Sequence, residues 1–169
     1  MAFRTIAAGV LLTVVLAAPA GAQVVRHQNP GTTPSLILQA VTVPPGAETL
    51  VLSGQLAAPI DPSKPPTGWE SFGDTKTQTI SILNKIKAIL ASKGYAMSDV
   101  IKLTVFVTAD PARTDGKMDF VGMNEGFKQF FRTAENPNTV ARSTVQVAGL
   151  AGPNFLVEIE ATAAKMPAK

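Results

Sequence analysis

The stretch Thr139-Val-Ala-Arg-Ser-Thr-Val-Gln-Val147 decides the fold, together with Phe155-Leu-Val-Glu-Ile-Glu-Ala161, which follows a short loop. Both runs read as β-strands, in which successive side chains point to opposite faces of the sheet. The first run carries Arg142, and the second carries Glu158 and Glu160 two positions apart. If residues 148–154 connect the two strands as a hairpin, a register that pairs even positions with even positions puts the arginine and both glutamates on one face. The sequence therefore predicts a guanidinium and carboxylates side by side on a rigid sheet.

The remaining elements follow from hydrophobic periodicity and turn signals. Residues 36–43 and 49–53 read as strands, and residues 44–48 as the turn of an antiparallel hairpin. Residues 100–107 form another strand, and a second helix with a stripe of phenylalanines is expected over residues 118–132.

The first helix is expected from Thr75 to Lys93, where apolar residues recur every three or four positions. Thr75-x-x-Gln78 matches a capping box, and Gly94 is a stop signal. The resulting order, β-β-α-β-α-β-β, predicts an α+β two-layer sandwich with both helices on one face of a mixed sheet.

Length and composition predict one exported domain. The chain has 169 residues, of which 16% are charged and 46% hydrophobic. Residues 1–22 combine a positive start, a short apolar stretch and the Ala20-Gly-Ala22 pattern, which together predict a cleaved secretory signal rather than a buried helix. We therefore expect a periplasmic or secreted protein with a flexible arm (residues 23–35), a domain (36–164) and a tail (165–169), and no membrane attachment after cleavage.

Several kinds of chemistry are excluded or disfavoured by the residues present. The chain has no cysteine and one histidine, His27, in the predicted arm, which disfavours thiol catalysis, a histidine triad and a metal site. Asp61, Glu70 and Asp74 match no EF-hand spacing. A net charge of +3 without a basic run gives nucleic-acid binding little support. Trp69 follows a proline-rich loop and is expected to anchor it rather than to stack on a ligand.

Arg142 has two interpretations from spacing alone. It forms a cross-strand ion pair worth under about 1 kcal/mol, or its planar fork binds the carboxylate of a small ligand while Glu158 holds a water. Spacing favours the first.

A family resemblance favours the second. Val140-Ala-Arg-Ser-Thr-Val-Gln-Val147 with Leu156-Val-Glu-Ile-Glu-Ala161 resembles the C-terminal signature of the Rid (YjgF-like) reactive-intermediate deaminases. Leu52-Ser-Gly-Gln55, residues 99–107 and the segment around Asn124 match other stretches of that family.

The resemblance implies a chorismate-mutase-like protomer, a homotrimer with ligand clefts between subunits, and a substrate that is a small imino acid hydrolysed to a keto acid without a cofactor. By position, Arg142 would bind the substrate carboxylate and Glu158 would orient the water. Thr144, Gly54, Ile37 and Asn124 would be the further substrate-binding positions.

The sequence also departs from the family pattern. A tyrosine is common on the first strand of the family, where this chain has Leu36 or Ile37, and Thr144 replaces a common cysteine. Two alternatives therefore stay open. One is a trimeric binding protein for carboxylates without turnover, and the other is a structural trimer in which Arg142 forms a salt bridge.

Overall fold

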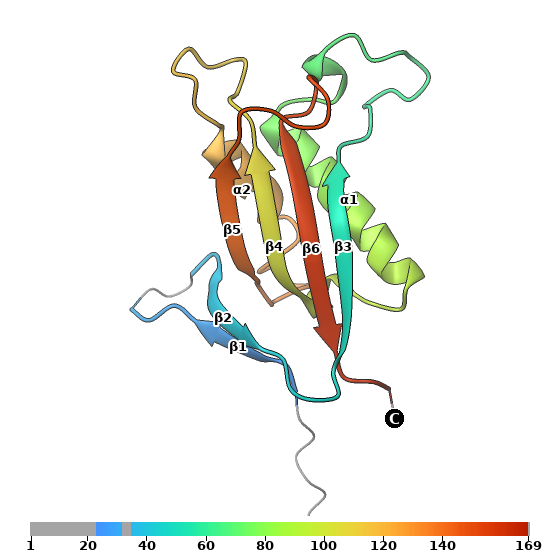
Figure 1. Ribbon diagram of the computed structural model, residues 1–169, viewed down its shortest axis with the longest axis vertical. Coiled ribbons are helices and arrows are strands. Elements are labelled where there is room, and N and C mark those ends of the chain that lie inside the picture. Colours follow the sequence, from blue (N-terminus) through green and yellow to red (C-terminus); the bar gives the residue numbers. More distant parts are fainter. Residues whose placement is uncertain (1–22, 32–34, 169) are drawn as a thin grey trace, which may run out of the picture.

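The fold is a six-stranded mixed sheet with both helices packed on one face (Figure 1). The computed structural model describes residues 23–31 and 35–168, so the predicted signal segment lies outside the described residues. The α+β two-layer class predicted from the sequence is confirmed. The elements are β1 (Val25–Gln28), β2 (Leu38–Thr42), β3 (Glu48–Leu56), α1 (Thr75–Ser92), β4 (Val100–Val107), α2 (Phe120–Phe127), β5 (Ala141–Gln146) and β6 (Val157–Lys165).

The strand order is β1-β2-β5-β4-β6-β3, so β4 lies between the two strands that the sequence predicts to form the C-terminal hairpin. β5 pairs with β4 in parallel, and β6 pairs with β4 antiparallel. The hairpin prediction is therefore wrong. Residues 148–154 carry the chain across β4, whose alternate residues are buried and which is the better central strand.

The predicted N-terminal hairpin is also wrong. β2 pairs with β1 and touches β5 only through Leu38 and Ala141, whereas β3 pairs with β6 at the opposite edge. The turn at residues 44–48 exists, with Ala47 N–H donating to the Pro44 carbonyl. It carries the chain past the ends of the central strands to β3 at the opposite edge of the sheet (Figure 1).

Part of the predicted flexible arm is ordered. Residues 25–28 form β1, and Arg26 Nη2 donates to the carbonyls of Ser98 (2.6 Å) and Val100 (3.2 Å) at the start of β4. Burial lowers the pKa of Arg26, and the nearby Asp99 carboxylate opposes that shift. The sequence therefore missed one strand.

α1 confirms the predicted helix but not its predicted cap. The N-cap is Asp74, whose side chain accepts from Thr77 N–H at 2.8 Å. This contact lowers the pKa of Asp74. Gly94 ends the helix in the left-handed conformation (φ 75°), as predicted. No helix in the described part of the chain is both long and apolar enough to cross a bilayer.

α2 is shorter than predicted, since the bonds after Phe127 tighten to single turns and Arg132 adopts a positive φ of 60°. Its Gly126 packs against α1, because a Cβ there would lie 2.8 Å from Thr79 Cβ. The two helices therefore approach closely over one face of the sheet.

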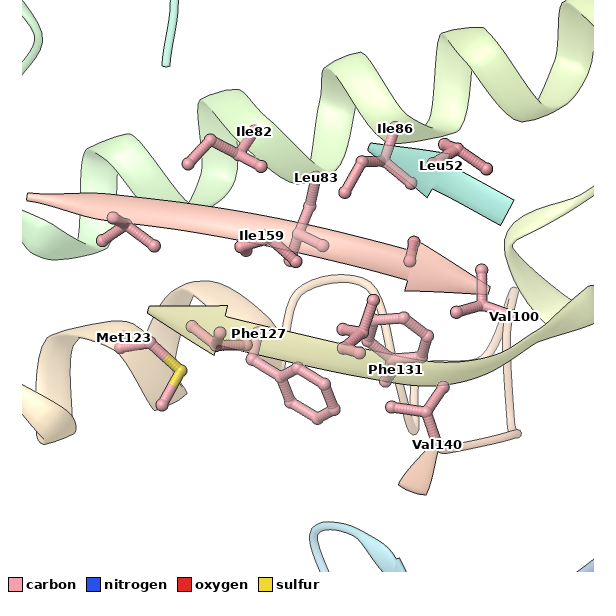
Figure 2. Close-up of a cluster of buried hydrophobic side chains, with 14 of the residues drawn as sticks. Leu52, Ile82, Leu83, Ile86, Val100, Met123, Phe127, Phe131, Val140 and Ile159 are labelled. Atoms are coloured by element: carbon pink, nitrogen blue, oxygen red, sulfur yellow. The ribbon is translucent and has the colours of Figure 1, made fainter. Parts of the chain in front are cut away.

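The hydrophobic core fills the space between the helices and the sheet (Figure 2). The rings of Phe127 and Phe131 stack with centroids 4.6 Å apart. The sheet's other face carries no helix (Figure 1), and Val51 on that side is 75% exposed. The core includes Leu52, Ile82, Leu83, Ile86, Val100, Met123, Phe127, Phe131, Val140 and Ile159.

Gln78, a fully buried residue of α1, joins the helix to the segment before β6. Its amide donates to the carbonyls of Gly73 (3.0 Å) and Asn154 (3.2 Å), and its oxygen accepts from Leu156 N–H (2.9 Å).

We predict that Gln78→Leu lowers the free energy of unfolding by about 3 kcal/mol, because one buried and two partly buried backbone groups lose their partners. Urea unfolding measures the change. The exposed Gln129→Leu is the matched control and should shift stability by less than about 0.5 kcal/mol. Equal stabilities for the two variants would contradict the prediction.

Candidate functional site

Arg142 lies on β5, on the face of the sheet that the helices cover. Its Cα partner on β4 is Leu103, which is fully buried on the core side. Its Nη2 donates to Asn124 Oδ1 at 2.7 Å, and Nη1 lies 3.7 Å from Met123 Sδ. The guanidinium carbon lies 4.5 Å from the centroid of the Phe127 ring, within cation–π range. β5 and α2 together therefore position the guanidinium between an amide, a sulfur and an aromatic ring.

The groups that contact the Arg142 guanidinium are all uncharged. Burial lowers the pKa of Arg142 to about 10. The salt bridges of the described residues join Lys64 to Asp61, Lys76 to Glu125 and Arg113 to Asp115, and none involves Arg142. A half-buried cation without a counter-ion attracts an anion, and its planar fork suits a carboxylate.

Thr144 and Asn124 belong to the same region. Thr144 pairs with Val105, so its side chain shares the covered face with Arg142. Its hydroxyl is buried and has no hydrogen-bond partner among the described residues. Asn124 approaches from α2 through its bond to Arg142. Of the predicted site residues, the structure brings these three together.

Glu158 and Gly54 form a second cluster. Glu158 on β6 pairs with Phe106 on β4 and with Leu56 on β3. A Cβ built on Gly54 would lie 1.8 Å from Glu158 Oε1, so the carboxylate occupies the space that any side chain at position 54 would need. The register shift of β3 between Leu52 and Gln55 falls at this contact. Gly54 therefore leaves room for the Glu158 carboxylate.

Arg142 and Glu158 do not share a face of the sheet, so that prediction is wrong. Arg142 aligns with Leu103, which aligns with Ala161 on β6, whereas Glu158 aligns with Phe106. Leu103 and Phe106 are three positions apart on β4 and point to opposite faces. Because β4 separates the two strands, one chain holds the arginine and the glutamate as separate clusters.

Glu160 lies near Thr104 and Lys102 in a hollow of about 290 Å³ on the uncovered face. Lys102 Nζ also contacts Ser143 Oγ at 2.9 Å. Glu160 is therefore surrounded differently from Glu158.

Ile37 lies directly before β2. Its carbonyl accepts from Asn29 Nδ2 (2.9 Å) and Ser35 Oγ (2.7 Å), while Leu38 N–H donates to the Val140 carbonyl. Ile37 thus lies beside the start of β5, next to Leu38, which pairs with Ala141, the residue before Arg142. Its side chain has no hydroxyl.

Other candidate positions have structural explanations. Trp69 packs against the core as the predicted anchor, and Asp74 is a helix cap. Asp61 pairs with Lys64, and His27 Nε2 bonds Thr42 Oγ1 on the exposed hairpin. Within residues 23–31 and 35–168, no group of three acidic or histidine side chains is arranged to hold a metal ion.

The sequence placed Phe127 in the core alone and missed its contact with the guanidinium. The signal for that contact was its position three residues after Asn124, on a neighbouring strip of the same helix.

Comparison with known proteins identifies the family. The family described as Endoribonuclease L-PSP matches residues 39–165. The chain belongs to this family, which is the Rid (YjgF-like) family of the sequence resemblance.

Individual relatives agree. The chain is 40% identical to a RutC family protein of Pyrococcus horikoshii over 116 residues, which cover 69% of this chain and 79% of that protein. It is similar to the Rid family protein YyfB of Yersinia pestis (25% identity, TM-score 0.62, 83% and 97% of the two chains). It is also similar to Escherichia coli TdcF solved with bound serine (35% identity, TM-score 0.51, 72% and 83%).

We predict that Arg142→Met raises the free energy of unfolding by about 1 kcal/mol, because the side chain keeps its length while the cost of burying an unpaired cation disappears. Denaturant unfolding at one protein concentration measures the change. The exposed Arg113→Met should change stability by less than about 1 kcal/mol. Clear destabilisation by Arg142→Met would mean that the Asn124 and Phe127 contacts outweigh the burial cost.

Proposed function

We propose that this protein hydrolyses small 2-imino or enamine acids to 2-keto acids and ammonia. The observation that carries the proposal is the Arg142 guanidinium, which is half-buried between Asn124 and Phe127 and lacks an anionic partner among the described residues. Binding a ligand carboxylate would stabilise this group, because the ligand supplies the negative charge that no described residue provides.

Glu158 is the proposed group that orients and deprotonates the attacking water. Water adds to the imine carbon, and one of its protons passes to the carboxylate and on to the nitrogen. The hydroxyl group of the resulting carbinolamine then gives its proton to the amine by the same route, and the C–N bond breaks as the carbonyl forms and ammonia leaves. An imine carbon is already electrophilic, so positioning and one general base suffice without a covalent nucleophile or a cofactor. Gly54 supports this role because a side chain at position 54 would displace the Glu158 carboxylate.

The site is proposed to be shared between subunits of a homotrimer. Arg142 and Glu158 face opposite sides of one sheet, so a cleft that contains both needs a second chain. The outer edge of β5 beyond Ala141 has no strand neighbour in the described part of the chain. Phe120 (45%) and Val121 (68%) beside it are exposed apolar residues, which favours burial against a neighbour.

The relatives support this proposal at the level of the family. TdcF of Escherichia coli, 37% identical over 113 residues, carries a name that proposes it as a reactive intermediate deaminase. Its structure holds serine, a small molecule with a carboxylate. For the endoribonuclease of the family's name, the charge pattern of this chain offers no support. Residues 1–22 support export, so the imines would arise outside the cytoplasm.

A binding protein without turnover is the second candidate. Ile37 favours it, because the position beside the start of β5 carries no hydroxyl to join the proton transfers.

We predict that wild-type protein accelerates the loss of an imine produced by an amino-acid oxidase, and that Glu158→Gln lowers this acceleration about 100-fold. Glu160→Gln is the matched control on the same strand and should stay near the wild-type rate. Arg142→Ala should abolish saturable binding of a keto acid. Binding without acceleration would select the second candidate, and equal effects at the two glutamates would sink the role of Glu158.

We predict that mixing the inactive Arg142→Ala and Glu158→Gln proteins, after unfolding and joint refolding, restores activity. In a ring of three identical interfaces, random mixing at equal amounts rebuilds about a quarter of the sites. The same variants refolded separately are the control. No recovery in mixed trimers would show that both residues act within one chain.

A further inference from the structure

A hollow of about 480 Å³ lies at the C-terminal end of α2. It is lined by Leu36, Lys128, Phe131 and Arg132. Two of these residues are cations, two are apolar, and no carboxylate is among them.

The hollow is close to the Arg142 cluster. Lys128 follows Asn124 by four residues, and its N–H donates to the Asn124 carbonyl at 3.0 Å, so the helical geometry continues through it. Residues four apart on a helix are neighbours on one face, with Cβ atoms about 5–6 Å apart. Lys128 therefore lies one helical turn from Asn124, the residue whose Oδ1 accepts a hydrogen bond from the Arg142 guanidinium. On the other side, Leu36 lies just before Ile37 and accepts from Thr139 Oγ1 at 2.6 Å.

Arg132 is held in an unusual conformation. Its φ of 60° is the only positive value recorded for a non-glycine residue in the described ranges. Asn138 accepts from its N–H at 3.1 Å, and its Nη2 donates to Gln28 Oε1 of β1 at 3.1 Å. Its Nε is buried and has no acceptor in the described part of the chain. A positive φ is costly for a non-glycine residue and persists only where the surrounding contacts fix it, so these contacts hold Arg132 in one place beside the hollow.

We propose that Lys128 and Arg132 bind a second anionic group of the substrate, so that the preferred substrates are imino acids with a carboxylate on the side chain. This inference rests on the proposed function, in which Arg142 binds the first carboxylate. Leu36 and Phe131 would pack against the methylene groups between the two charges.

The test compares two substrates of equal chain length, the imines formed by oxidases from L-glutamate and from L-norvaline. Wild-type kcat/KM should be about tenfold or more higher for the glutamate-derived imine, since a charge-assisted bond contributes at least that factor. Lys128→Met and Arg132→Asn should remove the preference while the norvaline-derived rate stays near wild type. Asn suits the positive φ at position 132. Lys93→Met, at the C-cap of α1, is the control and should keep the preference.

Calorimetric binding of 2-oxoglutarate and 2-oxovalerate separates this inference from the proposed function. Weaker binding of 2-oxoglutarate alone in the two variants supports the subsite even when no imine is turned over. Loss of both ligands in Arg142→Ala alone marks the first carboxylate site. Equal affinity of wild type for the two keto acids, or equal kcat/KM for the two imines, overturns the subsite and leaves the deaminase proposal standing.

Discussion

The central position of β4 is the constraint on which the rest of the structure depends. β4 accepts β5 on one side in parallel and β6 on the other side antiparallel. Through these two ladders it fixes which face every side chain of β5 and β6 occupies. Arg142 aligns with Leu103 and points to the face that the helices cover, and Glu158 aligns with Phe106 and points to the uncovered face. The geometry of the candidate site is thus decided by a strand that contributes none of the proposed catalytic groups.

Burial of Arg142 illustrates how stability and function oppose each other in this fold. A guanidinium held by one amide and an aromatic ring is stabilised less than one held by a carboxylate. The lowered pKa reports the same cost, since desolvation disfavours the charged form. A fold selected only for stability would place methionine or leucine at this position. The arginine and the Thr144 hydroxyl beside it, which has no hydrogen-bond partner among the described residues, are the features that the proposed ligand would account for.

Local patterns in the sequence predict single helices and strands more reliably than they predict which strands pair with one another. The strand at residues 100–107 and the first helix match their predicted spans closely, because alternation and helical periodicity are properties of the segment itself. Both predicted hairpins are wrong, because a short loop permits a crossover as well as a hairpin. For the C-terminal pair, the position of β4, which pairs with β5 along one edge and with β6 along the other, decides between them. β1 was missed because its four residues, VRHQ, carry no alternating apolar pattern.

The candidate site shows the same division. Arg142, Asn124 and Thr144 could be grouped from the sequence only through a family resemblance, since the contact between α2 and β5 joins residues 18 positions apart. The positive φ of Arg132 could not be predicted, because arginine carries no preference for that conformation.

The residues around the second hollow combine positive charge with apolar surface. Lys128 and Arg132 provide the positive charge beyond the C-terminal end of α2, and Leu36 and Phe131 provide the apolar part of the lining. Ile37, beside the start of β5, provides no side-chain hydrogen-bonding group. A short imino acid with a neutral side chain would leave these two cations in contact with water alone. A second carboxylate would bind them, and Lys128 lies one helical turn from Asn124, which contacts Arg142. The chemistry at the imine carbon would stay as sparse as in the proposed mechanism, while selectivity would come from the far end of the substrate.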